Sequence, residues 1–387
     1  MASGREKRRR AVALDDDEQR QEEAAALLRR IRGLVRWVVA EVGAGRSPSV
    51  AIHRYQNYCA STAASPCACS YDVPVGTDVL SLLHKDSHAS RLNVLLRVLL
   101  VVQQLLQQNK HCSKRDIYYM YPSIFLEQAA VDRAINDICI LFKCSRHNLN
   151  VVGTTCSSED SITLLEFLVM GWVRFLEGEK KIYCITNVNA AFSIPVSIEA
   201  IKDVVSVADY ILVVEKETVF QRLANDKFCE RNRCIVITGR GYPDIPTRRF
   251  LRYLVEWLHL PAYCLVDADP YGFDILATYK FGSLQLAYDA NFLRVPGIRW
   301  LGVFTSDFED YCLPECCLLQ LSSEDRRKAE GILSRCYLHR EAPEWRLELD
   351  AMLQKGVKFE IEALSASSIS FLSEEYIPQK IKEGRHI

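Results

Sequence analysis

The chain has 387 residues, of which 49% are hydrophobic and 25% are charged, with a formal net charge of −1. This composition is ordinary for a folded protein of two or three domains. A net charge near zero does not exclude a nucleic-acid-binding protein, because a basic groove can lie on the surface of a protein that is neutral overall. We expect no membrane span, since the longest apolar run, residues 92–106, is interrupted by Arg97 and two glutamines. The basic amino terminus has no apolar segment behind it, so we expect no secretory signal.

The 15 cysteines are odd in number and scattered, which favours a reduced compartment over a disulfide framework. Three of them, Cys59, Cys67 and Cys69, follow His53 and can be read as a zinc site. Their spacing matches no zinc-binding module that we can justify, and Cys-x-Cys in a Ser/Ala-rich loop is common by chance. We therefore do not favour zinc there.

The first 16 residues are charged and small, so we predict a disordered tail. Its basic run, residues 5–10, is interpreted as a nuclear localisation signal, a phosphate-contacting arm or a solvated tail. Residues 18–42 then show helical periodicity, with arginines on one face and an apolar stripe on the other. The stripe includes Leu28, Ile31, Val35 and Val38. It must be covered by its own domain or by a partner, and the pattern leaves both open.

Residues 93–108 and 126–144 are the next strong helical patterns, and residues 149–153 form a short strand pattern. The order helix, turn, helix and β-wing is typical of a winged-helix module, whose second helix usually lies in the DNA major groove. We interpret residues 156–164 as a surface insertion before a strand at residues 171–175.

From about residue 193 the pattern alternates between helices and strands, which predicts an α/β domain with a parallel sheet and crossover helices. The predicted helices span residues 198–207, 218–228, 247–259 and 271–279, and the predicted strands span residues 210–214, 234–237 and 264–266. Two further helices, residues 324–337 and 343–356, and the segment 357–364 are expected to pack around the sheet.

Three carboxylates follow the predicted strands: Glu215 after the first strand, and Asp267 and Asp269 after the third. Side chains at i and i+2 share one face, and ligands bind at the carboxyl edge of open α/β sheets. Three hard oxygen ligands suit Mg²⁺, which meets phosphates through open water positions. Gly239 and Gly241 would allow the backbone to approach a phosphate. The alternative is that these acids only cap helices.

Tyr118 and Tyr119 lie between the two predicted helices of the winged-helix candidate, next to Lys114 and Arg115. A guanidinium and a metal-bound phosphate nearby would favour ionisation of a phenol and neutralise a transition state. Attack on a phosphodiester would then give a covalent phosphotyrosine. The alternative is a pair of packed aromatic rings, and these residues alone do not decide between the two.

Four motifs occur in order: KRDIYYMYPSIF, VVEKETVFQRL, TGRGYPDIPTRRFL and VDADPYGFDIL. They resemble the meiotic double-strand-break transesterases, the eukaryotic relatives of the catalytic A subunit of archaeal topoisomerase VI, and most of all their plant-type members. The resemblance runs from about residue 93 to the carboxyl end and takes in the amino-terminal helix. It implies a winged-helix (CAP-like) domain at residues 91–180 and a Toprim domain, a Rossmann-like parallel sheet, at residues 190–387. Residues 17–90 would supply the amino-terminal amphipathic helix and a linker.

The resemblance also implies roles for individual residues. Tyr119 would be the nucleophile, Arg115 would assist it, and Glu215, Asp267 and Asp269 would hold Mg²⁺. The family acts as a dimer, in which the tyrosine of one protomer reaches the metal site of the other. It cuts double-stranded DNA in the nucleus and leaves protein attached to both 5′ ends.

A second set of expectations concerns binding. The implied partner is a B-like subunit that resembles a topoisomerase transducer. Its expected contact is the amino-terminal helix, through Leu28, Ile31, Val35 and Val38. The A-type chain is expected to pair with itself or with a paralogue. The residues expected at the DNA flank the Gly-rich turn, namely Arg240, Gly241, Tyr242, Arg248 and Arg249. For these residues a solvated helix surface is the alternative.

Two competing hypotheses remain. One is a metal-dependent hydrolase on the same acidic site, in which Tyr119 is merely packed. The other is a catalytically silent DNA-binding scaffold in a break-forming complex. The resemblance assigns no role to residues 59–70, and residues 156–167 are longer than the family pattern suggests.

Overall fold

The structure is a computed structural model that describes residues 2–60, 67–83, 85–152, 168–177, 180–185, 192–193, 198 and 201–387. The chain forms two compact units. Unit 1 comprises Met1–Tyr55 and Asp72–Leu165, and unit 2 comprises Gln56–Tyr71 and Glu166–Ile387. The sequence suggested a boundary at residues 180–190 instead. The difference arises because a strand at Leu168–Gly171 adds to the sheet of unit 2.

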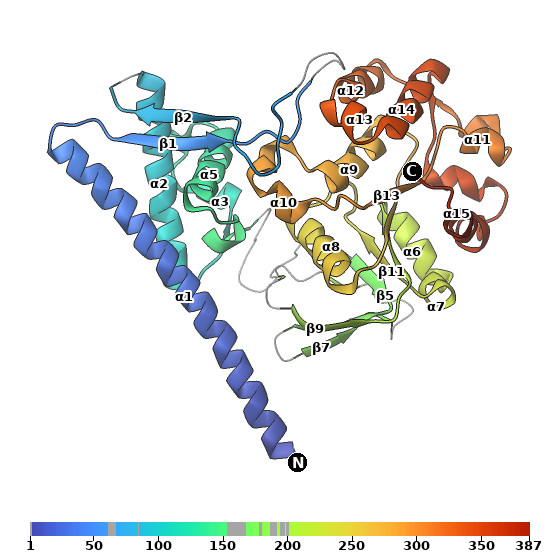
Figure 1. Cartoon of the computed structure of the whole chain (residues 1–387), viewed down its shortest axis with the longest axis horizontal. Helices are drawn as coiled ribbons and strands as arrows, with labels where there is room; N and C mark the ends of the chain where they lie inside the picture. Colours follow the sequence, from blue (N-terminus) through green and yellow to red (C-terminus); the bar gives the residue numbers. More distant parts are fainter. Residues whose placement is uncertain are drawn as a thin grey trace. The chain divides into compact units, whose positions relative to one another are not determined.

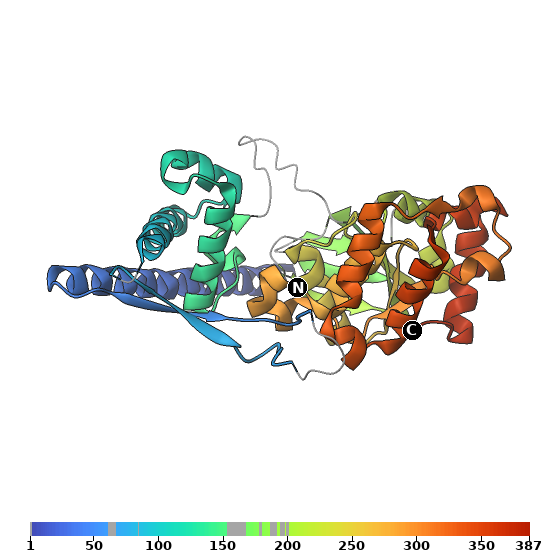
Figure 2. The same cartoon turned by 90° about the horizontal axis from the view of Figure 1, so that it is seen from above.

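Unit 1 begins with one long helix, α1 (Ala2–Gly43), which is continuous in Figures 1 and 2. The predicted helix of residues 18–42 lies within it. Residues 2–16 are also helical, which differs from the predicted disordered tail. The sequence of α1 contains no proline and is rich in Ala, Glu, Gln and Arg, so helix propensity favours continuation to the amino terminus.

The core of unit 1 is formed by α2 (Asp86–Gln108) and α5 (Gln128–Phe142), which pack against each other through apolar faces. A partly buried ion pair joins them, with Arg91 Nη2 2.9 Å from Oδ2 of the buried Asp137. Burial raises the pKa of Asp137, and Arg91 opposes that shift. Removing Arg91 would leave the buried charge of Asp137 uncompensated, so the pair helps to fix how the two helices meet.

The smaller elements of unit 1 surround this helix pair. They are β1 (Ser49–Arg54), β2 (Gly76–Ser81), β3 (Cys112–Ser113), α3 (Lys114–Met120), α4 (Pro122–Phe125) and β4 (Val151–Val152). The first two strands pair antiparallel, whereas β3 and β4 pair parallel. The predicted insertion at residues 156–167 lies outside the described residues.

Among the described helices, α2 alone is long and apolar enough to cross a membrane, judged by length and composition. Half of its most apolar window is buried inside the protein. Its buried side chains face α5 and α1, which is how a core helix packs.

Unit 2 is organised around a six-stranded sheet in the order β13-β12-β10-β11-β5-β8. The strands are β5 (Leu168–Gly171), β8 (Phe192–Ser193), β10 (Tyr210–Val214), β11 (Cys234–Thr238), β12 (Ala262–Leu265) and β13 (Arg299–Gly302). β10, β11, β12 and β13 run parallel, which confirms the predicted parallel sheet. Val214 lies opposite both Thr238 and Leu265, so the segments after these three strands emerge at one edge of the sheet.

Two apolar clusters cover the two faces of this sheet. Ile211 and Val213 of β10 belong to one cluster, whereas Leu212 and Val214 belong to the other, as strand alternation requires. The first face is covered by α8 (Ile245–Leu258), α9 (Pro270–Phe281), α12 (Ser323–Leu333), α13 (Cys336–Arg340) and α14 (Pro343–Lys355). The second face is covered by α6 (Glu217–Asn225), α7 (Phe228–Asn232) and α15 (Ile377–Glu383) (Figure 1). The predicted helix at residues 324–337 is thus divided into α12 and α13.

The helix predicted at residues 198–207 is wrong, because residues 201–206 form a strand, β9 (Ile201–Ser206). It pairs antiparallel with β6 (Val173–Glu177), which also pairs with β7 (Lys180–Tyr183). The segment contains the β-branched residues valine and isoleucine, which favour strands. Its hydrophobic periodicity did not distinguish a helix from a strand, and pairing with β6 makes it a strand.

The other elements of unit 2 are short. They are α10 (Ala290–Leu293), α11 (Asp307–Asp310), β14 (Leu319–Gln320) and β15 (Val357–Lys358). The last two pair antiparallel. An isolated bridge between Ala268 and Phe359 brings the segment after β15 beside the end of β12. This contact places the carboxyl-terminal acids of unit 2 near the strand-end carboxylates.

Gly171 provides a test of the junction between β5 and β11. Its φ is 108°, and a methyl group there would collide with the carbonyl oxygen of Cys234. We expect Gly171→Ala to lower the free energy of unfolding by about 2 to 4 kcal/mol, since it adds both strain and overpacking. The measurement is thermal unfolding of the purified chain. Gly331→Ala on α12, where a methyl group meets nothing within 4 Å, is the control and should not destabilise. Equal stability of the two variants would contradict this packing.

Candidate functional site

Glu215 and Asp267 lie side by side at the carboxyl edge of the sheet. Glu215 directly follows β10, and its backbone N–H donates to Leu265 O at 3.1 Å. The Asp267 backbone N–H donates to Glu215 Oε2 at 2.9 Å. The predicted convergence of these two residues is therefore present.

Asp269 has a second role that the sequence offered as an alternative. It is the N-cap of α9, and its Oδ1 accepts hydrogen bonds from the backbone N–H groups of Tyr271 at 2.9 Å and Gly272 at 2.7 Å. The cap and a metal-binding role are compatible, because a carboxylate has two oxygens and Oδ2 is free of the cap bonds. The negative charge of Asp269 also raises the pKa values of Glu215 and Asp267, which places it in the same electrostatic neighbourhood.

Gly272 is required where α9 begins against these acids. A Cβ at this position would lie 2.6 Å from Asp267 O and 3.0 Å from Glu215 Oε2. Any side chain would push the helix away from the strand ends. The glycine after Asp-Pro-Tyr could have been recognised as a close-approach residue, but that role was expected only of Gly239 and Gly241.

Lys216 is the residue that sequence reasoning missed. Its Nζ lies 2.8 Å from Asp267 Oδ2 and 2.9 Å from a carboxylate oxygen of both Glu360 and Glu362. Burial works to lower the pKa of Lys216, but the hydrogen bonds to Asp267, Glu360 and Glu362 outweigh it and the pKa is raised. The signal was available in the sequence, because a lysine next to a strand-end acid is a natural counter-ion.

The strand-end carboxylates are held in an environment that disfavours their ionised forms. Burial, followed by the charge of Asp267, raises the pKa of Glu215 to about 8. Burial also raises the pKa of Asp267 to about 6, although Lys216 and the Ile361 backbone N–H stabilise its charged form. Burial raises the pKa of Asp269, although the hydrogen bonds from the Gly272 and Tyr271 N–H groups lower it. A cation at this edge would therefore be favoured by electrostatics.

The Gly-rich turn after β11 lies against the same edge. The Gly241 backbone N–H donates to Glu215 O at 2.9 Å, and Gly241 has a φ of 99°. Arg240 is exposed and pairs with Glu217 at 2.8 Å. Tyr242 is half exposed, and its hydroxyl donates to Asp274 Oδ2 at 2.7 Å. These side chains lie at the surface beside the acids.

Arg248 corrects one expectation about DNA contact. It was expected to contact phosphates with Arg249, yet only 1% of its surface is exposed. Burial lowers the pKa of Arg248 to about 10. The residue points into the core from α8, so a DNA backbone has no access to its guanidinium. Arg249, the next residue on the helix, is half-buried.

Tyr119 and Arg115 lie on α3 of unit 1. The helix begins at a capping box, in which the Ser113 hydroxyl accepts from the Asp116 N–H at 3.1 Å and Asp116 Oδ2 accepts from the Ser113 N–H at 2.7 Å. Ile117 is fully buried and anchors the helix, whereas Tyr119 is 70% exposed. Arg115 is also exposed. The cap and the anchor thus hold an accessible phenol on a short, fixed helix.

The two adjacent tyrosines are not equivalent. Their rings pack edge to face, with centroids 5.3 Å apart. Tyr118 is half-buried, and its hydroxyl donates to Leu126 O at 3.4 Å. The hydroxyl of Tyr119 is on the exposed ring, so Tyr119 is the tyrosine that an external substrate can reach.

The apolar stripe of α1 is largely covered within unit 1. Ile31 and Val38 are buried, while Leu28 and Val35 are half-buried. α1 packs on α2, and the Arg30 guanidinium lies 5.3 Å from the ring centroid of Phe142 on α5. Ile31 and Val38 are therefore not free for a partner, contrary to our expectation. Periodicity shows only that a stripe must be covered and not by which surface.

Comparison with protein families defines the class. Residues 210–381 match the family model of the Toprim domain that Spo11 shares with the A subunit of topoisomerase 6. Residues 90–151 match the family model described as Type IIB DNA topoisomerase. Glu215, Asp267 and Asp269, with the strands β10 to β13, thus fall in the Toprim match, and Tyr119 falls in the other.

Individual relatives agree with the family models. The chain is 88% identical over 364 residues to the meiotic recombination protein SPO11-1 of Oryza sativa subsp. indica, with 93% of each chain covered. It is 58% identical to SPO11-1 of Arabidopsis thaliana, over 92% of this chain and 95% of the relative. It is 35% identical to the A subunit of DNA topoisomerase 6 of Arabidopsis thaliana, over 77% of this chain and 67% of the relative. The chain belongs to the family that unites Spo11 with the topoisomerase 6 A subunits.

The raised pKa of Glu215 gives a pH dependence with a definite sign. Between about pH 4.5 and about pH 8 the folded chain holds a proton on Glu215 that the unfolded chain has lost. The metal-free protein should therefore lose stability as the pH rises through this window, with Asp267 contributing in its lower part. We expect Glu215→Gln to weaken this dependence when melting temperatures are compared at about pH 5 and about pH 8 in chelator. The control is Glu375→Gln, an exposed position in unit 2. An identical pH slope in wild type and Glu215→Gln would refute the burial argument.

Proposed function

We propose that this chain is a DNA transesterase that makes meiotic double-strand breaks through a 5′-phosphotyrosyl intermediate and so initiates recombination. The observation that carries the proposal is the pairing of two features in one chain. One is an exposed tyrosine beside an arginine on a capped helix, and the other is a trio of strand-end acids in a Toprim sheet. A scaffold would need neither feature.

Tyr119 is the proposed nucleophile. Its exposure and the fixed start of α3 support this role, because a nucleophile must be reachable and also held in a limited range of orientations. The half-buried Tyr118, which donates to Leu126 O, is less suited. Arg115, exposed on the same helix, is proposed to place its positive charge near the phosphate under attack.

Glu215, Asp267 and Asp269 are the proposed ligands of Mg²⁺. Hard carboxylate oxygens are the ligands that Mg²⁺ takes, and the raised pKa values of all three groups indicate a place where added positive charge is stabilising. Lys216 already neutralises part of the negative charge at Asp267, and the cation would neutralise the charge that remains on the three carboxylates. When bound, Mg²⁺ would neutralise charge on the phosphate as a Lewis acid.

The proposed step exchanges one phosphoester for another. The Tyr119 oxygen forms a bond to the scissile phosphorus, and the bond from phosphorus to the 3′ oxygen breaks. The phenol loses its proton, and the leaving 3′ oxygen takes one up to become a hydroxyl. The 5′ phosphate remains on the tyrosine, so no hydrolysis occurs and the ester bond is conserved.

The DNA contacts are proposed to be mostly to phosphates. Arg240, Gly241 and Tyr242 lie beside the acids at the sheet edge, and Arg249 lies on the following helix. Such contacts set the position of a duplex and carry little sequence information. Arg248 is excluded because it is buried.

The remaining proposals follow the family resemblance. We propose that α2 and α5 form a winged-helix module, with β4 as part of its wing. The chain would act as a dimer, with itself or a paralogue, so that Tyr119 of one protomer serves the acids of the other. A B-like subunit would bind the exposed side of α1, where Trp37, Val39 and Val42 present apolar surface. Action on chromosomal DNA implies the nucleus.

Replacing Tyr119 by Phe tests the nucleophile. We expect Tyr119→Phe to abolish covalent attachment to DNA, because only the attacking oxygen is removed, while folding and duplex binding stay unchanged. The measurement is a denaturing gel of end-labelled duplex incubated with Mg²⁺ and the co-expressed B-like partner, followed by protease. Tyr118→Phe is the matched control and should still form the protease-sensitive 5′ adduct. Free 5′ phosphate in place of an adduct would identify a hydrolase, and no cutting by wild type would favour the scaffold.

Asp269→Asn separates the charge of Asp269 from its capping role. The amide oxygen can still accept the bonds from Tyr271 and Gly272, so the melting temperature should be close to that of wild type. Loss of one negative charge should reduce Mg²⁺-dependent adduct formation by roughly tenfold or more. Asp244→Asn, at the N-cap of α8, is the control and should cut normally. Full activity of Asp269→Asn across a Mg²⁺ titration would argue against metal binding there.

A further inference from the structure

The segment Gln56–Tyr71 belongs to unit 2, although the chain on both sides of it belongs to unit 1. Its described residues are anchored at both ends by side chains. Near the start, the fully buried Asn57 donates from Nδ2 to Phe281 O at 2.8 Å. At the end, the Arg294 guanidinium lies 3.7 Å from the ring centroid of Tyr71. A bridge between Gln56 and Ser70 joins the two ends.

The segment also pairs with the start of α13. The Cys336 N–H donates to Cys59 O at 2.9 Å, and Ala60 forms a bridge with Arg335. The Tyr58 ring packs edge to face on Tyr337, with centroids 5.2 Å apart. These contacts bring a cysteine from the far end of the sequence to the three cysteines of the segment.

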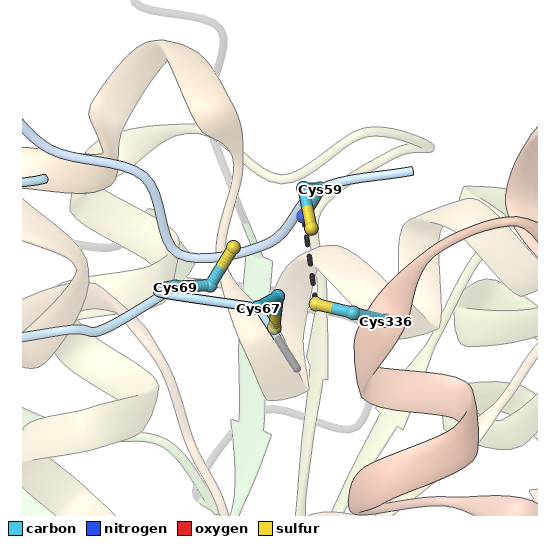
Figure 3. A group of neighbouring side chains, drawn as sticks. All are labelled: Cys59, Cys67, Cys69 and Cys336. Carbon is cyan, nitrogen blue, oxygen red and sulfur yellow. Dashed lines mark hydrogen bonds between the residues drawn. The ribbon is translucent and has the colours of Figure 1, made fainter. Parts of the chain in front are cut away.

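Four cysteines meet at this junction: Cys59, Cys67 and Cys69 from the segment, and Cys336 from α13. Their sulfur atoms all lie within 4.8 Å of one another. Figure 3 shows the four side chains gathered around one point, with the Cys59 backbone N–H directed at the Cys336 sulfur at 3.5 Å. Cys336 is buried and the other three are half-buried.

The distances suit a single tetrahedral ion. A zinc ion with Zn–S bonds of about 2.3 Å holds its sulfurs about 3.8 Å apart, so the side chains need to close in by about 1 Å at most. An iron–sulfur cluster with two irons would hold its pairs of sulfurs farther apart. No disulfide links any of the described cysteines, and all four of these thiols are free.

The surroundings suit thiolates. The Cys59 N–H and the Arg340 guanidinium, whose Nη1 lies 3.6 Å from Cys67 Sγ, both donate to cluster sulfurs. Four thiolates around Zn²⁺ carry excess negative charge, and N–H donors and a nearby arginine reduce its cost. His53, which the sequence placed with these cysteines, instead contacts Thr77 Oγ1 at 3.1 Å in unit 1.

We propose that Cys59, Cys67, Cys69 and Cys336 form a structural Cys₄ zinc site that fastens the segment Gln56–Tyr71 to α13. Four protein ligands leave no open position, so the site is structural and not catalytic. Zinc fits an all-sulfur tetrahedron in a reduced compartment, where the thiols do not pair as disulfides. The spacing Cys-x₇-Cys-x-Cys gave no zinc signal because the fourth ligand is distant in sequence.

The first experiment is metal analysis of the full-length chain, purified without chelator from cells grown with zinc. We expect about one zinc per chain by mass spectrometry of metals, and an X-ray absorption shell of four sulfurs at about 2.3 Å. Cys336→Ser should retain less than about one tenth of the wild-type zinc. Cys316→Ser, an exposed cysteine of unit 2, is the matched control and should keep the metal.

A second variant covers the case in which Cys336→Ser fails to fold. Cys69→His should retain zinc, with a shell of three sulfurs and one nitrogen, because imidazole is also a zinc ligand. Chelation should lower the melting temperature of wild type reversibly. The proposal is overturned if the folded wild-type chain holds no zinc, if the shell contains no sulfur, or if mass spectrometry finds a disulfide among the four.

Discussion

Unit 2 depends on the burial of negative charge at the ends of two parallel strands. Glu215 and Asp267 lie where the register of β10 and β12 brings them together, and α9 begins close against them at Gly272. Burial and mutual repulsion both disfavour their ionised forms. Lys216 compensates part of the charge and draws in Glu360 and Glu362 from the carboxyl-terminal segment. The last part of the chain is thereby tied to the site electrostatically.

In unit 1, local structure holds the exposed side chain of Tyr119, the proposed nucleophile, on a fixed helix. The capping box at Ser113 and the buried Ile117 fix α3 at two points, and Tyr119 projects to solvent beyond them. A nucleophile on a rigid helix loses little conformational entropy when a substrate binds. The chain thus combines buried carboxylates with raised pKa values at a sheet edge of unit 2 with the exposed phenol of Tyr119 in unit 1. Local packing within each unit holds its own group in place.

Much of unit 2 could be predicted, because buried parallel strands give short apolar runs and their ends carry the acids. β10, β11 and β12 lie within one or two residues of prediction. Features set by tertiary contact could not be predicted. The strand Ile201–Ser206 depends on pairing with β6, and Arg248 points inward because of how α8 packs. Lys216 could be expected beside Asp267, but its pairing with Glu360 and Glu362 depends on acids far along the chain. Cys336 likewise joins Cys59 only through the fold.

Residues 56–71 belong to unit 2 although the chain before and after them belongs to unit 1, and this changes the connectivity of the whole protein. The chain passes between the two units at residues 55/56, 71/72 and 165/166, so it makes three covalent crossings where a simple tandem arrangement would make one. Neither unit is therefore a contiguous stretch of polypeptide. A fragment that starts near residue 166 would lack the buried Asn57, so Phe281 O would lose its hydrogen-bond donor. In the intact chain, unfolding of one unit would act on the other through three covalent connections.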